Sequence, residues 1–299
     1  MSATTPTLSM LRRNGLPLWH LPIAIGLALM AVVANWSAWA DLVHQGWKDP
    51  EDTHVLLVPL VAAWLIWARR VRFRKLVPRH RWIGPVVVAL GWMLFSYGEA
   101  RTIDTFWYLG SATTLAGVAL TFGGIDLLRY FLPAFGVLIF LVPVPGSLRP
   151  HVALPLQTAT AAVVEWLFVA FGFPVERLGN VVEINGQPVL IEEACNGLRM
   201  VFSLILVTYA FAFSTPLRQY VRFLLLAASP LLAIACNVLR LVPTILLYGY
   251  ADDAVGDLFH DLAGWAMLFV ALLMLMGLLR LVDWLELPVI RLDRAGRSA

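Results

Sequence analysis

Two similar octapeptides contain the residues of this chain that could carry covalent chemistry. They read ACNGLRMV at 194–201 and ACNVLRLV at 235–242, agree at six of eight positions, and each holds a Cys, an Asn and an Arg. Cys195 and Cys236 are the only cysteines. Because the thiolate and not the thiol is the nucleophile, the surroundings of each cysteine decide whether it can react.

The two cysteines have different predicted surroundings. Cys195 opens a predicted helix, where first-turn N–H groups and Arg199, one turn on, favour a thiolate. Glu192 and Glu193 directly before it oppose that effect, so the sequence leaves the balance open. Cys236 lies in the middle of an apolar stretch, and we expect it to be a small packing residue.

The arginines show the opposite pattern. Arg199 is close to a helix start, where a long cationic side chain can reach the membrane surface. Arg240 lies about eight residues before the predicted helix end at Tyr248, ~12 Å along the axis. A guanidinium at that depth usually faces a polar cavity with a function, although an ion pair to a neighbouring helix is the structural alternative. Asn237, one turn earlier, can orient it.

His260 begins the last apolar stretch and is followed by Asp261. Histidine exchanges protons near neutral pH, although an isolated histidine at a membrane edge can also be a plain interfacial residue. Cysteine-dependent acyl transfer can use a thiol nucleophile, a proton carrier and a fixed cation that stabilises the oxyanion. Cys195, His260 and Arg240 would supply these three groups if the fold brings them together.

The elements that must position these residues are membrane helices. Of the 299 residues, 60% are hydrophobic and only 14% are charged, which is typical of a polytopic membrane protein and not of a globular domain. The net charge of +3 does not indicate nucleic-acid binding, and no Cys/His spacing predicts a metal site. We expect no cofactor. The predicted spans are about 18–39, 55–68, 82–97, 105–122, 127–142, 195–213, 223–248 and 261–282.

Basic residues in short loops predict the orientation of these eight spans. The segment RRVRFRKLVPRHR at 69–81 is the densest basic cluster and should be cytoplasmic. Both termini are then cytoplasmic, and Cys195, Arg240 and His260 fall in the same outer leaflet. The side of each loop can be counted forward from this basic cluster or backward from the basic C-terminal tail. The two counts agree only if the apolar segment 152–171 does not cross the membrane and lies along the outer surface as an interfacial helix.

The segment 175–193 differs from its surroundings. Its Asn185-Gly186 pair stands between the β-type runs VVEI and PVLI, which predicts a β-hairpin. A plain connecting loop is the alternative. We therefore expect an all-α polytopic fold with one small extracytoplasmic hairpin.

EEACNGLRM, NVLRL and HDLAGW, in this order, resemble the exosortase/archaeosortase family, and so do the hairpin, the LVPVPGSLRPHVALPLQ stretch and the DPEDTH loop. Two departures stand out. Asp52, Thr53 and Val55 replace the Tyr, Ser and Gly of the family's Asp-Pro-x-Tyr-Ser-His-Gly pattern, which puts a role for His54 in doubt. Asn196 stands where many relatives have Ser. The resemblance implies a single exosortase-type transmembrane domain over 1–299, with its catalytic helices at 195–282.

The resemblance also implies an activity. Such a protein would be a membrane cysteine transpeptidase of the bacterial inner membrane, with Cys195, Arg240 and His260 catalytic and facing the periplasm. Arg199, Asn237, Asp261 and Asn196 would support them. Its substrates would be exported proteins with a C-terminal sorting signal, made of a Pro-Glu-Pro-like motif, a transmembrane helix and a basic tail. The surface acceptor is not identified.

Three other functions stay open on the sequence alone. A transporter or exopolysaccharide-export component would also use an arginine within a membrane helix. A non-catalytic scaffold could bind a partner through the hairpin. Plain proteolysis, with water as acceptor, has the same nucleophile and oxyanion requirements as transpeptidation.

Overall fold

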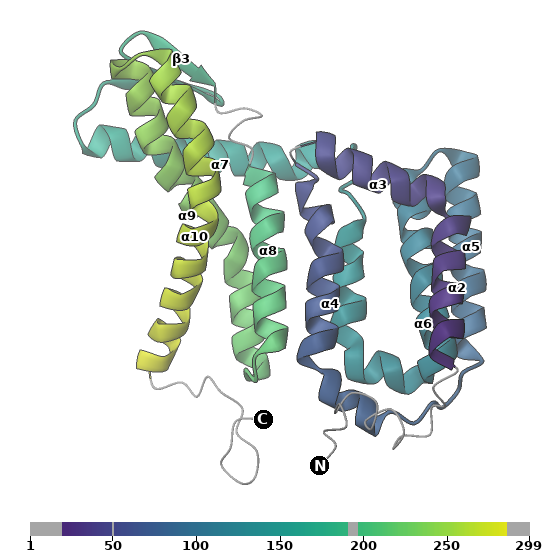
Figure 1. Ribbon diagram of the computed structural model, residues 1–299. Coiled ribbons are helices and arrows are strands. Elements are labelled where there is room, and N and C mark those ends of the chain that lie inside the picture. The colour runs from purple at the N-terminus through teal and green to yellow at the C-terminus, as the bar shows by residue number, and fades with distance from the viewer. Residues whose placement is uncertain (1–19, 50, 191–196, 286–299) are drawn as a thin grey trace, which may run out of the picture. The chain divides into compact units, whose positions relative to one another are not determined.

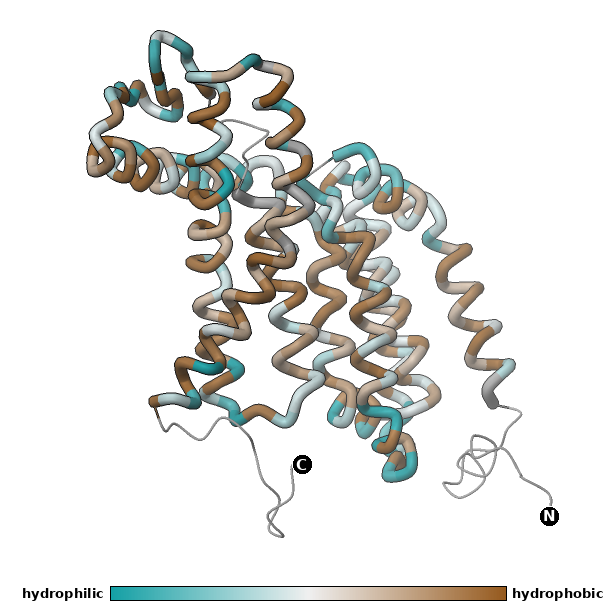
Figure 2. Tube along the Cα trace, turned by 60° about the vertical axis from the view of Figure 1, so that its left-hand side comes forward, coloured by the Kyte–Doolittle hydropathy of each residue, from teal (hydrophilic) through white to brown (hydrophobic). Residues whose placement is uncertain are grey.

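The computed structural model describes residues 20–49, 51–190 and 197–285. The chain divides into two compact units, Met1–Pro145 and Gly146–Ala299, here called the N-terminal and C-terminal units. Both are mainly helical (Figure 1). Apolar residues occupy the middle of most helices, and hydrophilic residues gather at helix ends and connections (Figure 2).

The N-terminal unit consists of helices joined by short connections. Its described elements are α2 (His20–Ala34), α3 (Trp36–Lys48), η1 (Thr53–Leu57), α4 (Val58–Ala68), η2 (Arg70–Lys75), α5 (Ile83–Arg101), α6 (Asp104–Gly136) and η3 (Val137–Leu141).

Glycines spaced by seven residues bring α5 and α6 into very close contact. The series comprises Gly84, Gly91 and Gly98 in α5, and Gly110 and Gly117 in α6. A Cβ atom built on Gly91 would lie 2.5 Å from the backbone nitrogen of Thr114, and one on Gly110 would lie 2.3 Å from that of Phe95. Small residues drive helix association in membranes because they let the backbones approach, and a seven-residue period keeps one face toward an antiparallel partner.

Gly124 divides α6 into two runs. Its φ of 62° and ψ of −167° are not helical, and a Cβ there would lie 2.1 Å from the carbonyl oxygen of Arg79. The N–H of Ile125 donates to that same carbonyl at 3.0 Å. In Figure 1, α6 runs along α5 before this point and then turns to return beside α4. The break explains why the sequence predicts separate spans at 105–122 and 127–142.

A second break lies at Asn35, between α2 and α3. The two helices are bent by 74°, and the Asn35 side-chain amide donates to the carbonyl of Ala31 at 2.8 Å. As a result α3 lies across the end of the unit, as Figure 1 shows. The expected continuous span at 18–39 is therefore a bent pair.

The described part of the C-terminal unit combines four helices with a three-stranded sheet. Its described elements are α7 (Arg149–Ala170), β1 (Val175–Leu178), β2 (Val181–Ile184), β3 (Gln187–Leu190), α8 (Gly197–Ser214), α9 (Gln219–Tyr250) and α10 (Asp253–Trp284). Figure 1 shows α8, α9 and α10 running along a common direction, with α7 lying across them. The start of α8, the end of α9 and the start of α10 are on the same side as the sheet.

The sheet is an antiparallel meander, β1-β2-β3. The predicted hairpin is confirmed: β2 and β3 are joined by Asn185 and Gly186, whose φ angles of 53° and 77° define the two positive-φ positions of a type I′ turn. The additional strand β1 joins β2 through Gly179 and Asn180, with Gly179 at φ 65° as a type II′ turn requires.

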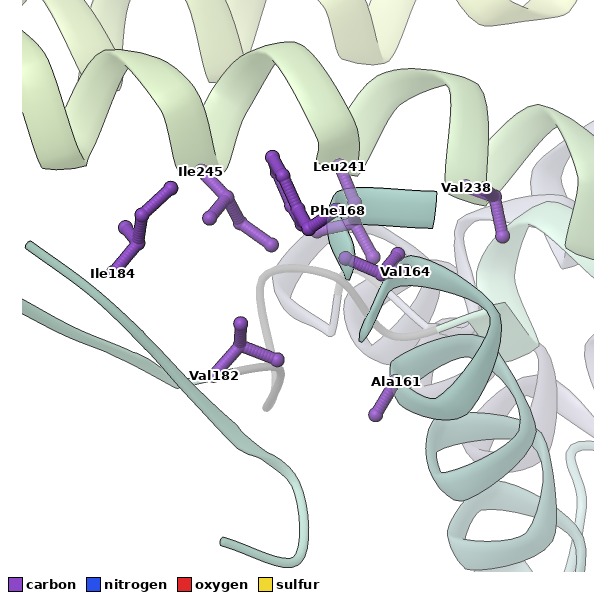
Figure 3. Close-up of a cluster of buried hydrophobic side chains, with 8 residues drawn as sticks. All are labelled: Ala161, Val164, Phe168, Val182, Ile184, Val238, Leu241 and Ile245. Carbon is purple, nitrogen blue, oxygen red and sulfur yellow. The ribbon is translucent and has the colours of Figure 1, made fainter. Parts of the chain in front are cut away.

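An apolar cluster holds the sheet against α7 and α9. Figure 3 shows its eight side chains meeting between the three elements; they are Ala161, Val164 and Phe168 of α7, Val182 and Ile184 of β2, and Val238, Leu241 and Ile245 of α9. Gly249 near the end of α9 lets the sheet approach, since a Cβ there would lie 2.6 Å from Cγ2 of Ile184. The Asn185 side-chain amide donates to the Gly249 carbonyl at 3.0 Å.

The number of spans agrees in part with the predicted eight. Among the described residues, four helices are long and apolar enough to cross a membrane, and the bent α2–α3 pair would be a fifth; the four are 83–101, 104–141, 149–170 and 219–250. The apolar helices at 53–68 and 200–214 are shorter. By length α7 could also cross, but its direction across α8–α10 is that of the interfacial helix expected at 152–171.

The α5–α6 contact yields a stability prediction. We expect Gly91→Ala to lower the thermal midpoint of the detergent-solubilised protein by several degrees, because the new methyl group would overlap the α6 backbone and overpacking costs about 1–3 kcal/mol. The control is Gly26→Ala in α2, where a Cβ meets nothing within 4 Å. Equal midpoints for the two variants would contradict the close packing.

Candidate active site

The structure describes the side chains of three of the seven predicted site residues: Arg240, Asn237 and His260. Cys195 and Asn196 lie outside the described residues. Arg199 and Asp261 are helical positions of α8 and α10, and their side chains also fall outside the described part. The described side chains are therefore those of the predicted cation, its amide partner and the predicted proton carrier. The predicted nucleophile, Cys195, lies two residues before α8 in the sequence.

Two faces of α9 have different neighbours. Val238, Leu241 and Ile245 face α7 and the sheet, whereas Ala233 and Cys236 pack against α8 and α10. Residues four apart lie on the same side of a helix. Arg240 and Thr244 therefore continue the face of Cys236, so that the Arg240 side chain starts on the side of α9 that belongs to α8 and α10.

Polar contacts fix Arg240 within this apolar helix. Its Nη2 donates to Oδ1 of Asn237 at 3.1 Å, and the Thr244 hydroxyl donates to its backbone carbonyl at 2.8 Å. Asn237 is only 2% exposed and Arg240 is half-buried. The predicted pairing of these two side chains is thus present, and one amide oxygen orients a guanidinium that retains further N–H donors.

His260 lies on the face of α10 that meets α9. It is one turn after Gly256, where a Cβ would lie 2.6 Å from the ring of Tyr248, and three residues before buried Ala263. The Tyr248 hydroxyl also donates to Oδ1 of Asp257 at 2.6 Å. The two antiparallel helices therefore pair Tyr248 with Gly256 and Asp257.

This pairing gives the heights of the two candidate groups. Along the helix axes, His260 of α10 lies opposite about Ile245 of α9. Arg240 lies between four and five residues from that point, toward the start of α9. At 1.5 Å per residue the axial offset is roughly 7 Å, which is within the reach of an arginine side chain. His260 is half-buried. Arg240 and His260 therefore arise from facing sides of adjacent helices, near the end where α8 begins.

Cys236 has the apolar surroundings expected of a packing residue. It is fully buried in a cluster with Val201 and Leu204 of α8, Ala233 of α9 and Ala271 of α10. Its Sγ lies 3.4 Å from Sδ of Met274. The second octapeptide, 235–242, thus contains both the hydrogen-bonded Arg240 and the buried packing residue Cys236.

Sequence reasoning missed a polar network in the N-terminal unit. The Tyr108 hydroxyl contacts Asp41 and lies 3.0 Å from Oε1 of Gln45, and Nε2 of Gln45 donates to Oδ2 of Asp52 at 2.7 Å. Asp52, His54 and Tyr108 are each 2% exposed. Asp41 and Gln45 are one turn apart in a segment that alternates polar and apolar residues with helical spacing, and this pattern was the available signal.

These features define an integral membrane protein with a helical fold and a small sheet. The sequence profile of the transmembrane exosortases matches residues 46–277, which is most of the chain, and the protein belongs to that family. The matched range includes Cys195, Arg240 and His260. Comparison with curated proteins and with solved structures gave no significant match. Among the described residues, no three His, Cys, Asp or Glu side chains are grouped as a metal site.

The burial of Cys236 predicts its reactivity. In a Cys195→Ala variant Cys236 is the only thiol, and we expect no labelling by a water-soluble maleimide while the protein is folded, because the side chain is fully buried among three helices. Denaturation in SDS should give complete labelling, measured by intact mass.

A matched variant controls for the access of the reagent. Tyr250 ends α9 and is 57% exposed, so Cys195→Ala combined with Tyr250→Cys should label in the folded state. Rapid labelling of Cys236 in the folded single variant would contradict its buried position.

Proposed function

We propose that this protein is a cysteine transpeptidase that cleaves the C-terminal sorting signal of exported proteins and transfers them to a surface acceptor. The observation that carries the proposal is the placement of Arg240, held by Asn237 on the face of α9 toward α8 and α10 and roughly 7 Å along the axis from His260. Membership of the exosortase family supports it, because the chemistry of that family is generally cysteine transpeptidation.

The first half of the reaction forms a thioester. The Cys195 thiolate attacks the scissile carbonyl, and the carbonyl π electrons move to oxygen to give a tetrahedral oxyanion. The N–H groups of Arg240 donate hydrogen bonds to that oxygen, and its positive charge stabilises the negative charge that develops there in the transition state. Collapse of the intermediate breaks the C–N bond, and His260 as imidazolium gives its proton to the leaving amine.

The second half releases the acyl group. Neutral His260 takes a proton from the incoming acceptor nucleophile, which attacks the thioester carbonyl, and Arg240 again stabilises the oxyanion. The C–S bond then breaks, the thiolate returns and the imidazolium is regenerated, so the enzyme is unchanged after one cycle. If water is the acceptor, the same steps give hydrolysis.

The positions of the sheet and α7 suit a substrate that emerges from a membrane. The sheet, the end of α9 and the starts of α8 and α10 lie at one end of the unit, with α7 across it. We assign this end to the periplasmic surface of the bacterial inner membrane, with both termini cytoplasmic. A signal whose motif directly precedes a transmembrane helix would reach the site there. Arg199 and Asp261 would lie beside the reacting groups, and Asn196 next to the nucleophile.

The transporter alternative gains nothing from the fold. Transporters are commonly built from two related halves, whereas here the C-terminal unit has a three-stranded sheet that the described part of the N-terminal unit lacks. The transpeptidase proposal also gives Arg240 and His260 distinct roles.

The decisive test compares the two cysteines. On co-expression with a precursor that carries a sorting signal, we expect wild type and Cys236→Ala to give a new C-terminus by mass spectrometry, and Cys195→Ala to give only the uncleaved precursor. The mass of the new terminus separates transfer from hydrolysis. If the Cys195→Ala variant still produced the same new C-terminus as wild type, the mechanism would be rejected.

Substitutions of Arg240 test the oxyanion role. Loss of one oxyanion donor typically slows acyl transfer about 10²–10³-fold, and we expect Arg240→Gln to reduce the initial rate of processing by at least that factor. The rate of Arg240→Lys should lie between those of wild type and Arg240→Gln, because lysine keeps the positive charge but lacks the planar pair of N–H donors.

The control removes the same charge from a neighbouring helix. Arg280 is exposed and lies near the opposite end of α10, so Arg280→Gln should retain the wild-type rate. Equal rates for Arg240→Gln and wild type, with both proteins folded by thermal melt, would remove Arg240 from the reaction.

A further inference from the structure

A strongly basic segment joins α4 to α5 at the end of the N-terminal unit opposite α3 (Figure 1). It holds seven Arg and Lys residues within thirteen positions, and no acidic residue occurs between Asp52 and Glu99. We call these seven residues the basic face; they are Arg69, Arg70, Arg72, Arg74, Lys75, Arg79 and Arg81.

Specific contacts hold this segment against the turn of α6. The Arg72 Nη1 donates to the carbonyl of Tyr130 at 3.1 Å, and the rings of Phe73 and Phe131 are 4.4 Å apart. The Arg79 carbonyl accepts from Ile125, and Leu76 is 2% exposed. The backbone that carries the basic face is thus fixed to the helices, and is not a loosely attached charged loop.

Among the described residues, most cations of the basic face have no acidic partner. Arg74 and Lys75 are exposed and make no ion pair or hydrogen bond with the described residues. Arg70 lies over the ring of Trp67 at 4.3 Å and donates to a backbone carbonyl. The one acidic group near the α6 turn, Asp126, is paired with Arg129 at 3.9 Å. The Arg81 Nε is shielded from solvent and lacks an acceptor among the described residues.

Exposed apolar side chains alternate with these cations. Val71 is 62% exposed, Val77 54% and Trp82 65%. The boundary between headgroups and acyl chains suits aromatic and aliphatic side chains next to arginine and lysine.

We propose that the basic face binds the phosphate headgroup of anionic phospholipids in the leaflet on its side of the membrane. Arg74 and Arg81 would donate to phosphate oxygens, Lys75 would act as a point charge, and Val71, Val77 and Trp82 would contact the acyl boundary. The partner is a lipid and not a soluble anion, because the same surface presents both charge and apolar area at the end of membrane helices.

Charge-based orientation of the chain explains the number of cations but not their arrangement. A topological signal depends on a count of Lys and Arg near the span, and it needs neither the Arg72 contact to Tyr130 nor the ring contact between Phe73 and Phe131. The fixed frame is what a binding surface requires.

The test uses the full-length protein in neutral detergent, with phosphatidylglycerol or phosphatidylcholine added. For wild type we expect phosphatidylglycerol adducts in native mass spectra and a rise of several degrees in the thermal midpoint, with phosphatidylcholine giving neither. Arg74→Gln combined with Lys75→Gln should reduce adduct formation several-fold. The control, Lys48→Gln combined with Arg101→Gln, makes the same charge change at exposed positions of the same unit and should bind like wild type.

Three outcomes would overturn the proposal. These are unchanged phosphatidylglycerol binding by the Arg74/Lys75 variant, an equal loss in the control variant, and an equal stabilisation by inorganic phosphate at matched ionic strength, which would indicate a soluble anion. The readout needs no processing activity, so it is independent of the proposed transpeptidase function.

Discussion

The apolar contact between α7, β2 and α9 sets the geometry of the C-terminal unit. Close van der Waals packing holds apolar elements together in a membrane, and Phe168, Ile184, Leu241 and Ile245 are each almost completely buried there. The contact places the sheet over the end of α9, where Gly249 allows Ile184 to approach. In the sequence, Cys195 follows the end of β3 by five residues.

The same contact determines where Arg240 can point. Successive helix positions are fixed relative to one another, so holding Val238, Leu241 and Ile245 against α7 and the sheet turns Cys236 and Arg240 toward α8 and α10. A guanidinium in a membrane helix is expensive unless it is paired or hydrated. The Asn237 oxygen offsets part of that cost and limits the directions that the side chain can take. Packing and polar pairing thus act on adjacent faces of one helix.

Local signals predicted some parts of this structure and long-range contacts decided others. The Asn185-Gly186 turn follows from backbone sterics of two residues and was predictable, as was the packing role of Cys236, which follows from its position in an apolar stretch. Strand β1 was missed although Gly179-Asn180 is also a turn signal, because VERL alone lacks a clear alternation. The bend at Asn35 was missed, because a polar residue within an apolar stretch does not by itself predict a change of direction. The interruption near Gly124 was predicted as a gap between two spans, but its partner, the carbonyl of Arg79 45 residues earlier, is a long-range contact. The arrangement of Arg240 and His260 required the pairing of Tyr248 with Gly256, which spacing does not contain.

The three residues of the proposed site are synthesised at different times. Arg240 follows Cys195 by 45 residues and His260 follows it by 65. At about 5–20 residues per second of synthesis, the thiol would leave the ribosome roughly 3–13 s before the histidine. The N-terminal unit, with its α5–α6 hairpin, is complete in sequence before any of these groups is made. The proposed catalytic set is therefore incomplete until α10 has been synthesised, and the proposed reaction would begin only when α10 has joined α8 and α9.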